Sequence, residues 1–198
     1  MNFRPAFLLL LVLVGSATSV SAGSKSVPKV ADFSIAGIKL NDAKSSLAVL
    51  GREISSETDP ALIEDNTEMP HAMAVNKAGT QVLTFYFHHG GEVMAFSEFK
   101  VSLASETKLT GKPIKLASVA KFATGKGIKL GLSETQLINI LGPPQERSSA
   151  DGAVVLDYRI KDPEAGQSLF DYPAELYYGT YTFKAGKLTE FRFGFHYP

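Results

Sequence analysis

The sequence predicts an α+β protein made of a tandem duplicated unit, each copy a short helical segment packed on an antiparallel β-meander. Three observations predict this class: an internal repeat, a short amphipathic pattern in each copy, and alternating strand patterns after it. Val-Ala-x-Phe at 30–33 returns at 119–122, and Gly-Ile-Lys-Leu at 37–40 returns at 127–130. The offsets are 119 − 30 = 89 and 127 − 37 = 90 residues. Self-similarity at a fixed period is typical of a duplicated structural unit.

Residues 1–22 have the pattern of a signal peptide and are set apart from the fold. Arg4 gives a positive start, 6–14 is an apolar run, and 20–22 carries the small residues of a cleavage site. The run is far shorter than the roughly 20 residues that span a bilayer. We therefore expect an exported, soluble protein, periplasmic or secreted, without a membrane span. The chain has no Cys, so no lipid anchor or disulfide is expected.

The repeat also predicts how the rest of the chain is divided. We expect an N-terminal tail at 23–29, repeat unit 1 at 30–104, a Lys-rich connector at 105–118 and repeat unit 2 at 119–198. Two small units of this length can share one core.

Charge is balanced in total but unevenly placed. Without Arg4 the chain has 20 − 1 = 19 basic and 20 acidic residues, which argues against a nucleic-acid partner. Between 100 and 129 there are seven Lys and one acid, and between 53 and 68 there are six acids and no base. Both runs are explained by solvated surface, and the alternative is a docking site for a partner or an anionic surface.

Each unit carries one short helix pattern. In the second unit Ser133 and Gln136 fit a capping box, Leu137 and Leu141 give an apolar stripe, and Gly-Pro-Pro at 142–144 ends the helix. In the first unit Asp42 or Asn41 caps, Leu47 and Leu50 are expected to face inward, and Gly51 ends the helix. Helices this short need tertiary packing to be stable.

The apolar period changes to two after each helix, which predicts strands. In the second unit the expected strands are 153–160, 175–183 and 187–197, with a hairpin turn at 185–186. Phe191, Phe193 and Phe195 are expected to form the core face under the helices. In the first unit the strands are expected at 71–76, around 83–87 and at 93–101, with turns at 77–79 and 90–91.

One motif resembles a known family. Gly-Ile-Lys-Leu-Gly-x-Ser-x-x-x-Leu-x-x-x-Leu-Gly-x-Pro at 127–144, with a meander ending in Phe-x-x-Gly-x-Leu-x-x-Phe at 183–191, is similar to the β-lactamase-inhibitor-protein-like fold. Single-unit relatives include the small envelope lipoproteins of the SmpA and OmlA family. The match covers 119–198 well and 30–104 more loosely. The resemblance implies two helical layers on a curved sheet whose open face holds a partner protein.

Catalytic patterns are sparse. His88 and His89 are adjacent in an expected strand and point to opposite faces, so they do not readily chelate one ion. No Gly-x-Ser-x-Gly elbow or phosphate loop occurs. We therefore expect no catalytic residues, no metal and no cofactor.

The candidate binding residues lie in and after a long loop at 161–173. The loop carries Leu169, Phe170, Asp171 and Tyr172, and Tyr178 follows it on the next strand. Exposed aromatic residues are favoured at binding hot spots, and long loops in compact domains are often functional.

The sequence therefore predicts an exported non-catalytic binding module that recognises a protein or cell-envelope partner through its sheet face and the 161–173 loop. The alternatives are an inhibitor of an exported enzyme and, with least support, a small metal-dependent hydrolase built from His88, His89 and the acids at 57–68.

Overall fold

A computed structural model describes residues 31–54, 61–63, 69–87, 94–160 and 176–196. These residues form two α-helices, one short 3₁₀ helix and eleven strands. In chain order the elements are β1 Ser34–Ile35, β2 Ile38–Lys39, α1 Ala43–Leu50, β3 Leu62–Ile63, β4 His71–Asn76, β5 Gln81–Phe87, β6 Phe96–Leu103, η1 Ala104–Glu106, β7 Ile114–Leu116, α2 Glu134–Leu141, β8 Glu146–Ala150, β9 Ala153–Ile160, β10 Leu176–Lys184 and β11 Lys187–His196.

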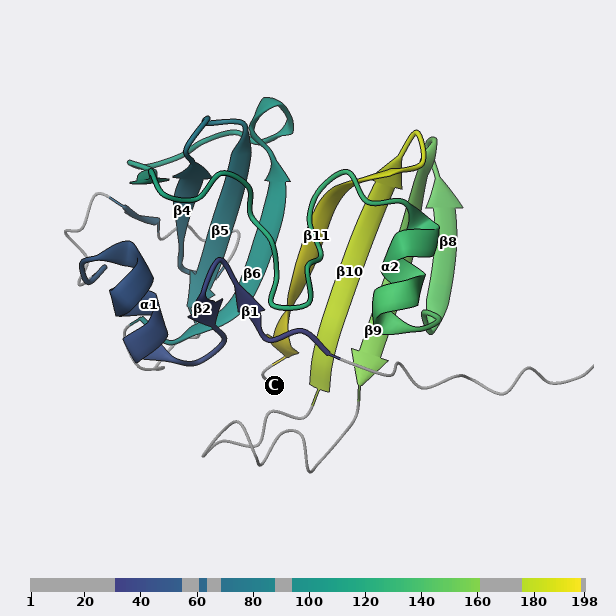
Figure 1. The fold of residues 1–198 in the computed structure, drawn as a ribbon, viewed down its shortest axis with the longest axis horizontal. Coiled ribbons are helices and arrows are strands. Elements are labelled where there is room, and N and C mark those ends of the chain that lie inside the picture. Colours follow the sequence, from purple (N-terminus) through teal and green to yellow (C-terminus); the bar gives the residue numbers. More distant parts are fainter. Residues whose placement is uncertain (1–30, 55–60, 64–68, 88–93, 161–175, 197–198) are drawn as a thin grey trace, which may run out of the picture.

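One large sheet organises the molecule (Figure 1). Nine strands belong to it, in the order β3-β4-β5-β6-β11-β10-β9-β8, with β7 added beside β4. Neighbouring strands are antiparallel except for the β4–β7 pair, which is parallel. Strands β6 and β11 pair at the centre, with Phe99 opposite Phe193, so the sheet is continuous from one half of the chain to the other.

The predicted α+β class, a tandem pair of helix-on-meander units, is wrong. The described part of the chain is mostly β, with 48% of its residues in strands and 14% in helices, and its antiparallel strands form a large sheet. Each α-helix has only eight residues, so strands dominate the fold. The physical reason for one sheet is that a meander ending at β6 or β11 alone would leave a long row of unpaired backbone groups, and these two edges pair with each other.

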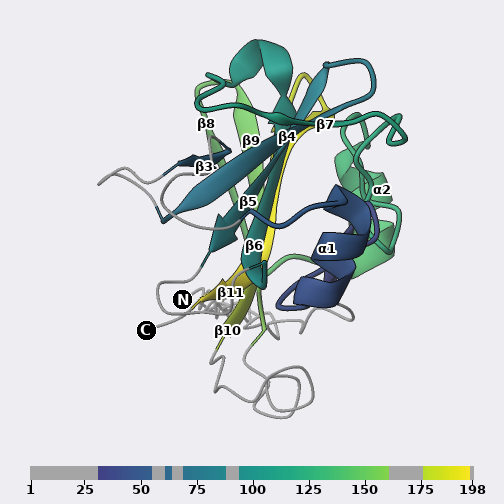
Figure 2. The same ribbon diagram turned by 90° about the vertical axis from the view of Figure 1, so that its left-hand side faces the viewer.

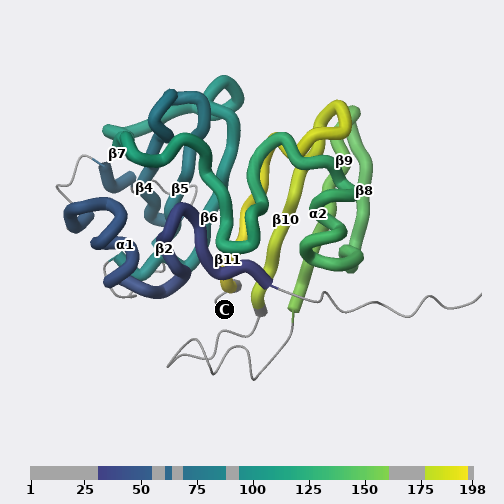
Figure 3. The backbone as a smooth tube through the Cα atoms, in the orientation of Figure 1, coloured from purple at the N-terminus to yellow at the C-terminus, as the bar shows by residue number. Residues whose placement is uncertain are grey.

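Both α-helices and the chain between β7 and α2 lie on one side of this sheet (Figure 2). Figure 3 shows that this connecting segment crosses in front of β6 and β11 before it enters α2. Its path is fixed by backbone hydrogen bonds from Gly131 to Leu188 and from Leu188 to Leu132, each 2.8 Å long. The buried core lies between this layer and the sheet, and it includes Leu137 of α2 and the predicted Phe191, Phe193 and Phe195.

The helix ends follow the predicted chemistry in most respects. The Ser133 hydroxyl accepts from the Gln136 amide and the Gln136 side chain accepts from the Ser133 amide, which confirms the capping box. Asp42 caps α1, and Gly51 ends it in the left-handed region. Leu47 is not inward as predicted, because it is 41% exposed. The helix turns Ser46 and Leu50, four residues apart, towards the core instead.

Candidate functional site

The sheet has a second face, which we call the open face, opposite the helices. Side chains alternate along a strand, so the residues between the core positions project to this side. On β5, β6 and β11 most of these residues are polar, with Val82 as an apolar exception, whereas their neighbours on the core face are mainly aromatic. The open face carries Thr84, Tyr86, Glu98, Lys100, Ser102, Glu190 and Arg192.

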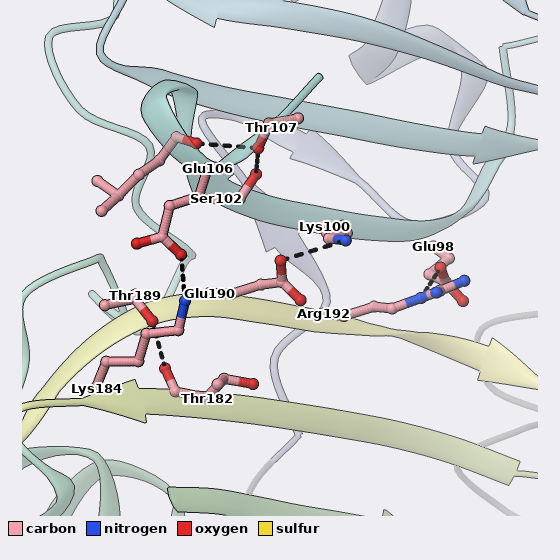
Figure 4. Close-up of polar contacts among 11 residues, drawn as sticks. Glu98, Lys100, Ser102, Glu106, Thr107, Thr182, Lys184, Thr189, Glu190 and Arg192 are labelled. Atoms are coloured by element: carbon pink, nitrogen blue, oxygen red, sulfur yellow. Dashed lines mark hydrogen bonds and ion pairs between the residues drawn. The ribbon is translucent and has the colours of Figure 1, made fainter. Parts of the chain in front are cut away.

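Three ion pairs join the two halves of the sheet across this face (Figure 4). Arg192 of β11 pairs with Glu98 of β6. Lys100 of β6 pairs with Glu190 of β11 at 3.2 Å, and Lys184 of β10 reaches Glu106 of η1 at 2.5 Å. The pairs therefore tie β6 and η1 to β10 and β11.

The Glu98–Arg192 pair is the least exposed of the three. The Glu98 side chain is 2% exposed and that of Arg192 is 35% exposed. The Arg192 guanidinium lies 4.7 Å from the centre of the Tyr86 ring, within the range of a cation–π contact. Gly194 stands opposite Glu98, and a Cβ there would lie 2.5 Å from the Ser97 carbonyl oxygen. Glycine is therefore required for β6 and β11 to approach closely beside the buried glutamate.

A pocket of about 270 Å³ opens on the first half of the open face, and we call it the open-face pocket. Its floor consists of buried side chains from the two neighbouring strands β4 and β5, namely His71, Met73, Thr84 and Tyr86. His71 Nδ1 lies 3.0 Å from the Met69 carbonyl oxygen, which can only accept, so Nδ1 carries the proton. When the ring is neutral, Nε2 is left as an acceptor.

The rim of the pocket comes from the chain after β6 and from two ion-paired residues. Thr107, Lys108 and Thr110 follow η1, and Glu106, Lys100 and Glu190 complete the rim. Thr107 is fixed by donating to the Leu103 carbonyl oxygen at 3.0 Å and by a 2.6 Å contact with the Ser102 hydroxyl. The rim is therefore polar, charged and positioned by hydrogen bonds.

A second polar surface covers the other half of the open face, on β9 and β10. We call Asp157, Arg159, Tyr178 and Thr180 the β9–β10 surface. The Thr180 hydroxyl donates to Asp157 at 2.7 Å, and Arg159 lies 3.5 Å from the same carboxylate oxygen. The Arg159 guanidinium sits 5.3 Å from the centre of the Tyr178 ring. This half of the face is at least partly exposed, so the ordered arginine and tyrosine are accessible.

The core below contains three buried tyrosines with displaced ionisation. Burial raises the pKa of Tyr158 to about 12 and raises those of Tyr177 and Tyr181 well above the ordinary value. The Tyr177 hydroxyl oxygen accepts from the Asp32 amide at 3.1 Å, and Tyr158 donates to the Gly142 carbonyl oxygen. The Tyr181 hydroxyl has no hydrogen-bond partner among the described residues. These hydroxyls therefore stay protonated below pH 10, with their rings packed in the core.

The predicted site residues divide into two groups. Tyr178 lies on the open face, beside Arg159. Leu169, Phe170, Asp171 and Tyr172 lie outside the described residues, as do His88, His89 and the acids at 57–68.

Sequence reasoning did not select the pocket residues, although one signal for them exists. Thr84 and Tyr86 alternate with the buried Leu83 and Phe85, and the pattern predicts only that they share the other face. The predicted meander places β5 beside β6, but it does not reveal that β6 meets β11.

Within the described ranges, no three His, Asp or Glu side chains come together in a way that could hold a metal ion. Nor does that part of the chain contain a helix with the length and apolar character needed to cross a membrane. Comparison with known proteins finds no family model, curated protein or solved structure that matches the chain.

Proposed function

We propose that this protein is an exported, non-catalytic binding module that holds a protein or cell-envelope partner on the open face of its sheet. The observation that carries the proposal is the β9–β10 surface, where Tyr178 and Arg159 are partly exposed and already ordered. Tyrosine and arginine are enriched at binding hot spots. A partner that covers them gains contact area without a large cost in side-chain ordering.

The hydrogen bonds around Arg159 support this role. The Gln145 side chain accepts from the Arg159 amide at 2.7 Å and donates to the Arg159 carbonyl oxygen at 2.5 Å. Asp157 adds a carboxylate on one side of the guanidinium. Backbone and side chain are therefore both fixed before a partner arrives. The predicted 161–173 loop connects β9 to β10, so its two ends join the strands that carry this surface.

The test is capture of an envelope partner by the purified protein and by two charge-reversal variants. Arg159→Glu changes the β9–β10 surface, and Lys121→Glu changes an exposed lysine of the segment that crosses the helix side. We expect wild type and Lys121→Glu to capture the same partner and Arg159→Glu to lose it by at least tenfold, because an arginine hot spot contributes about 2 kcal/mol. Equal capture by all three proteins, with unchanged melting temperatures, would contradict the proposal.

A further inference from the structure

The charges that line the open-face pocket limit the kind of ligand that it can hold. Both of its acids are engaged, since Glu190 pairs with Lys100 and Glu106 pairs with Lys184. Lys108 is exposed on the rim, and no ion pair joins it to an acid among the residues that the structure describes. The pocket therefore offers one ammonium group whose charge the protein does not balance locally.

The remaining polar groups suit hydroxyls. Thr84 and Thr110 bring hydroxyl groups that both donate and accept. Thr107 brings a hydroxyl oxygen whose proton is already given to the Leu103 carbonyl, and His71 brings Nε2, which accepts when the ring is neutral. Thr110 donates only a long contact, 4.0 Å to the sulfur of Met73, so its hydroxyl remains available for a better acceptor. Groups of this kind match a ligand with several hydroxyls.

Size limits the ligand further. A volume of about 270 Å³ lies just below the usual range of about 300–1,000 Å³ for small-molecule sites. The floor is buried and lies on regular strands, which hold its side chains in fixed positions. A molecule of monosaccharide size fits these limits better than a nucleotide or a peptide.

We propose that the open-face pocket binds a monosaccharide-sized sugar with one anionic group, which Lys108 pairs with while the threonine hydroxyls and His71 contact the sugar hydroxyls. This ligand is separate from the macromolecular partner proposed above, because the β9–β10 surface lies on the other half of the sheet (Figure 1). Loss of one activity therefore does not imply loss of the other.

The test is calorimetric titration at constant ionic strength with four probes. Glucuronate and glucose 6-phosphate carry both features, glucose lacks the charge, and acetate lacks the hydroxyls. We expect at least one sugar anion to bind about tenfold more tightly than both controls, or about 1.4 kcal/mol, because hydrogen bonds to charged groups are stronger than those between neutral groups. No preference over glucose, or none over acetate, overturns the proposal.

Two variants distinguish the pocket from a general basic surface. Lys108→Met is expected to reduce the affinity for the preferred sugar anion about tenfold, whereas Lys112→Met, four residues further and outside the pocket lining, leaves it unchanged. Equal losses from both variants would show that scattered lysines attract the anion and would overturn the assignment. Thr84→Val tests the floor with little change in volume, and full affinity in a folded Thr84→Val protein would also count against the site.

Discussion

Strands β6 and β11 pair at the centre of the sheet, and we call this pairing the seam. Replacing Arg192 by Met tests whether the stability of the seam depends on the Glu98–Arg192 ion pair. Glu98 is 2% exposed, so the substitution leaves a buried carboxylate without its arginine partner. Breaking a buried ion pair from one side costs about 3–5 kcal/mol. The Arg192 side chain is 35% exposed, and water can replace part of what it provides, so we expect the lower end, about 3 kcal/mol.

Removing the negative charge of Glu98 as well should restore most of the lost unfolding free energy. Glu98→Gln combined with Arg192→Met leaves a neutral amide of similar shape, and the double variant is expected within about 1–2 kcal/mol of wild type. Lys184→Met provides the matched control. It breaks a pair whose side chains are 52% and 41% exposed, and such surface pairs contribute about 0–1 kcal/mol.

Urea titration followed by circular dichroism gives the three differences in unfolding free energy. A loss below about 1 kcal/mol for Arg192→Met would mean that Glu98 does not depend on the arginine. A double variant no more stable than Arg192→Met would mean that the cost comes from lost packing against Tyr86 and not from the loss of the arginine charge beside Glu98.

Three further predictions concern the core. Leu137→Ala should cost about 2–5 kcal/mol in a denaturant titration, whereas Leu47→Ala should cost below about 1 kcal/mol, because the first is fully buried and the second is 41% exposed. Tyr181→Phe should be neutral or stabilising in a thermal melt, and Tyr177→Phe should cost about 1 kcal/mol through loss of the bond from the Asp32 amide. Between pH 10 and pH 12 the unfolded chain loses the Tyr158 proton and the folded chain keeps it, so stability should fall by about 1.4 kcal/mol per pH unit for each such tyrosine. Absorbance at about 295 nm should show these tyrosines ionising only as the protein unfolds, and ionisation near pH 10 in the folded state would contradict their burial.

Local patterns in the sequence were sufficient to predict several elements. Strand 153–160 matches β9, and the strand at 71–76 matches β4, because both have strong alternation between turn signals. The turn at 185–186 is present, with positive φ at both Ala185 and Gly186. These features depend on neighbouring residues, which the sequence displays directly.

Features that depend on distant pairing were not predictable. β8, Glu146–Ala150, was missed because all five of its residues are exposed and its sequence lacks an apolar alternation. The pairing of β6 with β11 joins residues about 90 positions apart, such as Val101 and Phe191, and no local pattern encodes it. The prediction that Leu47 faces the core was wrong for a related reason. A two-turn helix can turn either of two neighbouring rows of side chains towards the core, and tertiary contacts select one of them.

The candidate site follows the same division. Tyr178 was found from the sequence as an aromatic residue outside the core stripe, but its ordered partner Arg159 belongs to another strand. The meander places β4 beside β5, as predicted. The open-face pocket also needs the chain after β6 to fold back over both strands, and no local pattern shows this, so its residues could not be grouped in advance.

The charges of the open face have two different roles. In each of the three ion pairs at the seam the basic side chain balances the acidic one. The pairs join β6 and η1 to β10 and β11, so their role is structural. The groups proposed to contact ligands lie on either side of the seam, with Lys108 at the pocket and the Tyr178–Arg159 pair on the β9–β10 surface. A seam held by a buried glutamate keeps these two surfaces at a fixed separation on one continuous sheet, and rigid support of this kind is what binding sites require. Variants that weaken the seam should therefore reduce both binding activities together, whereas Lys108 and Arg159 variants should each affect only one.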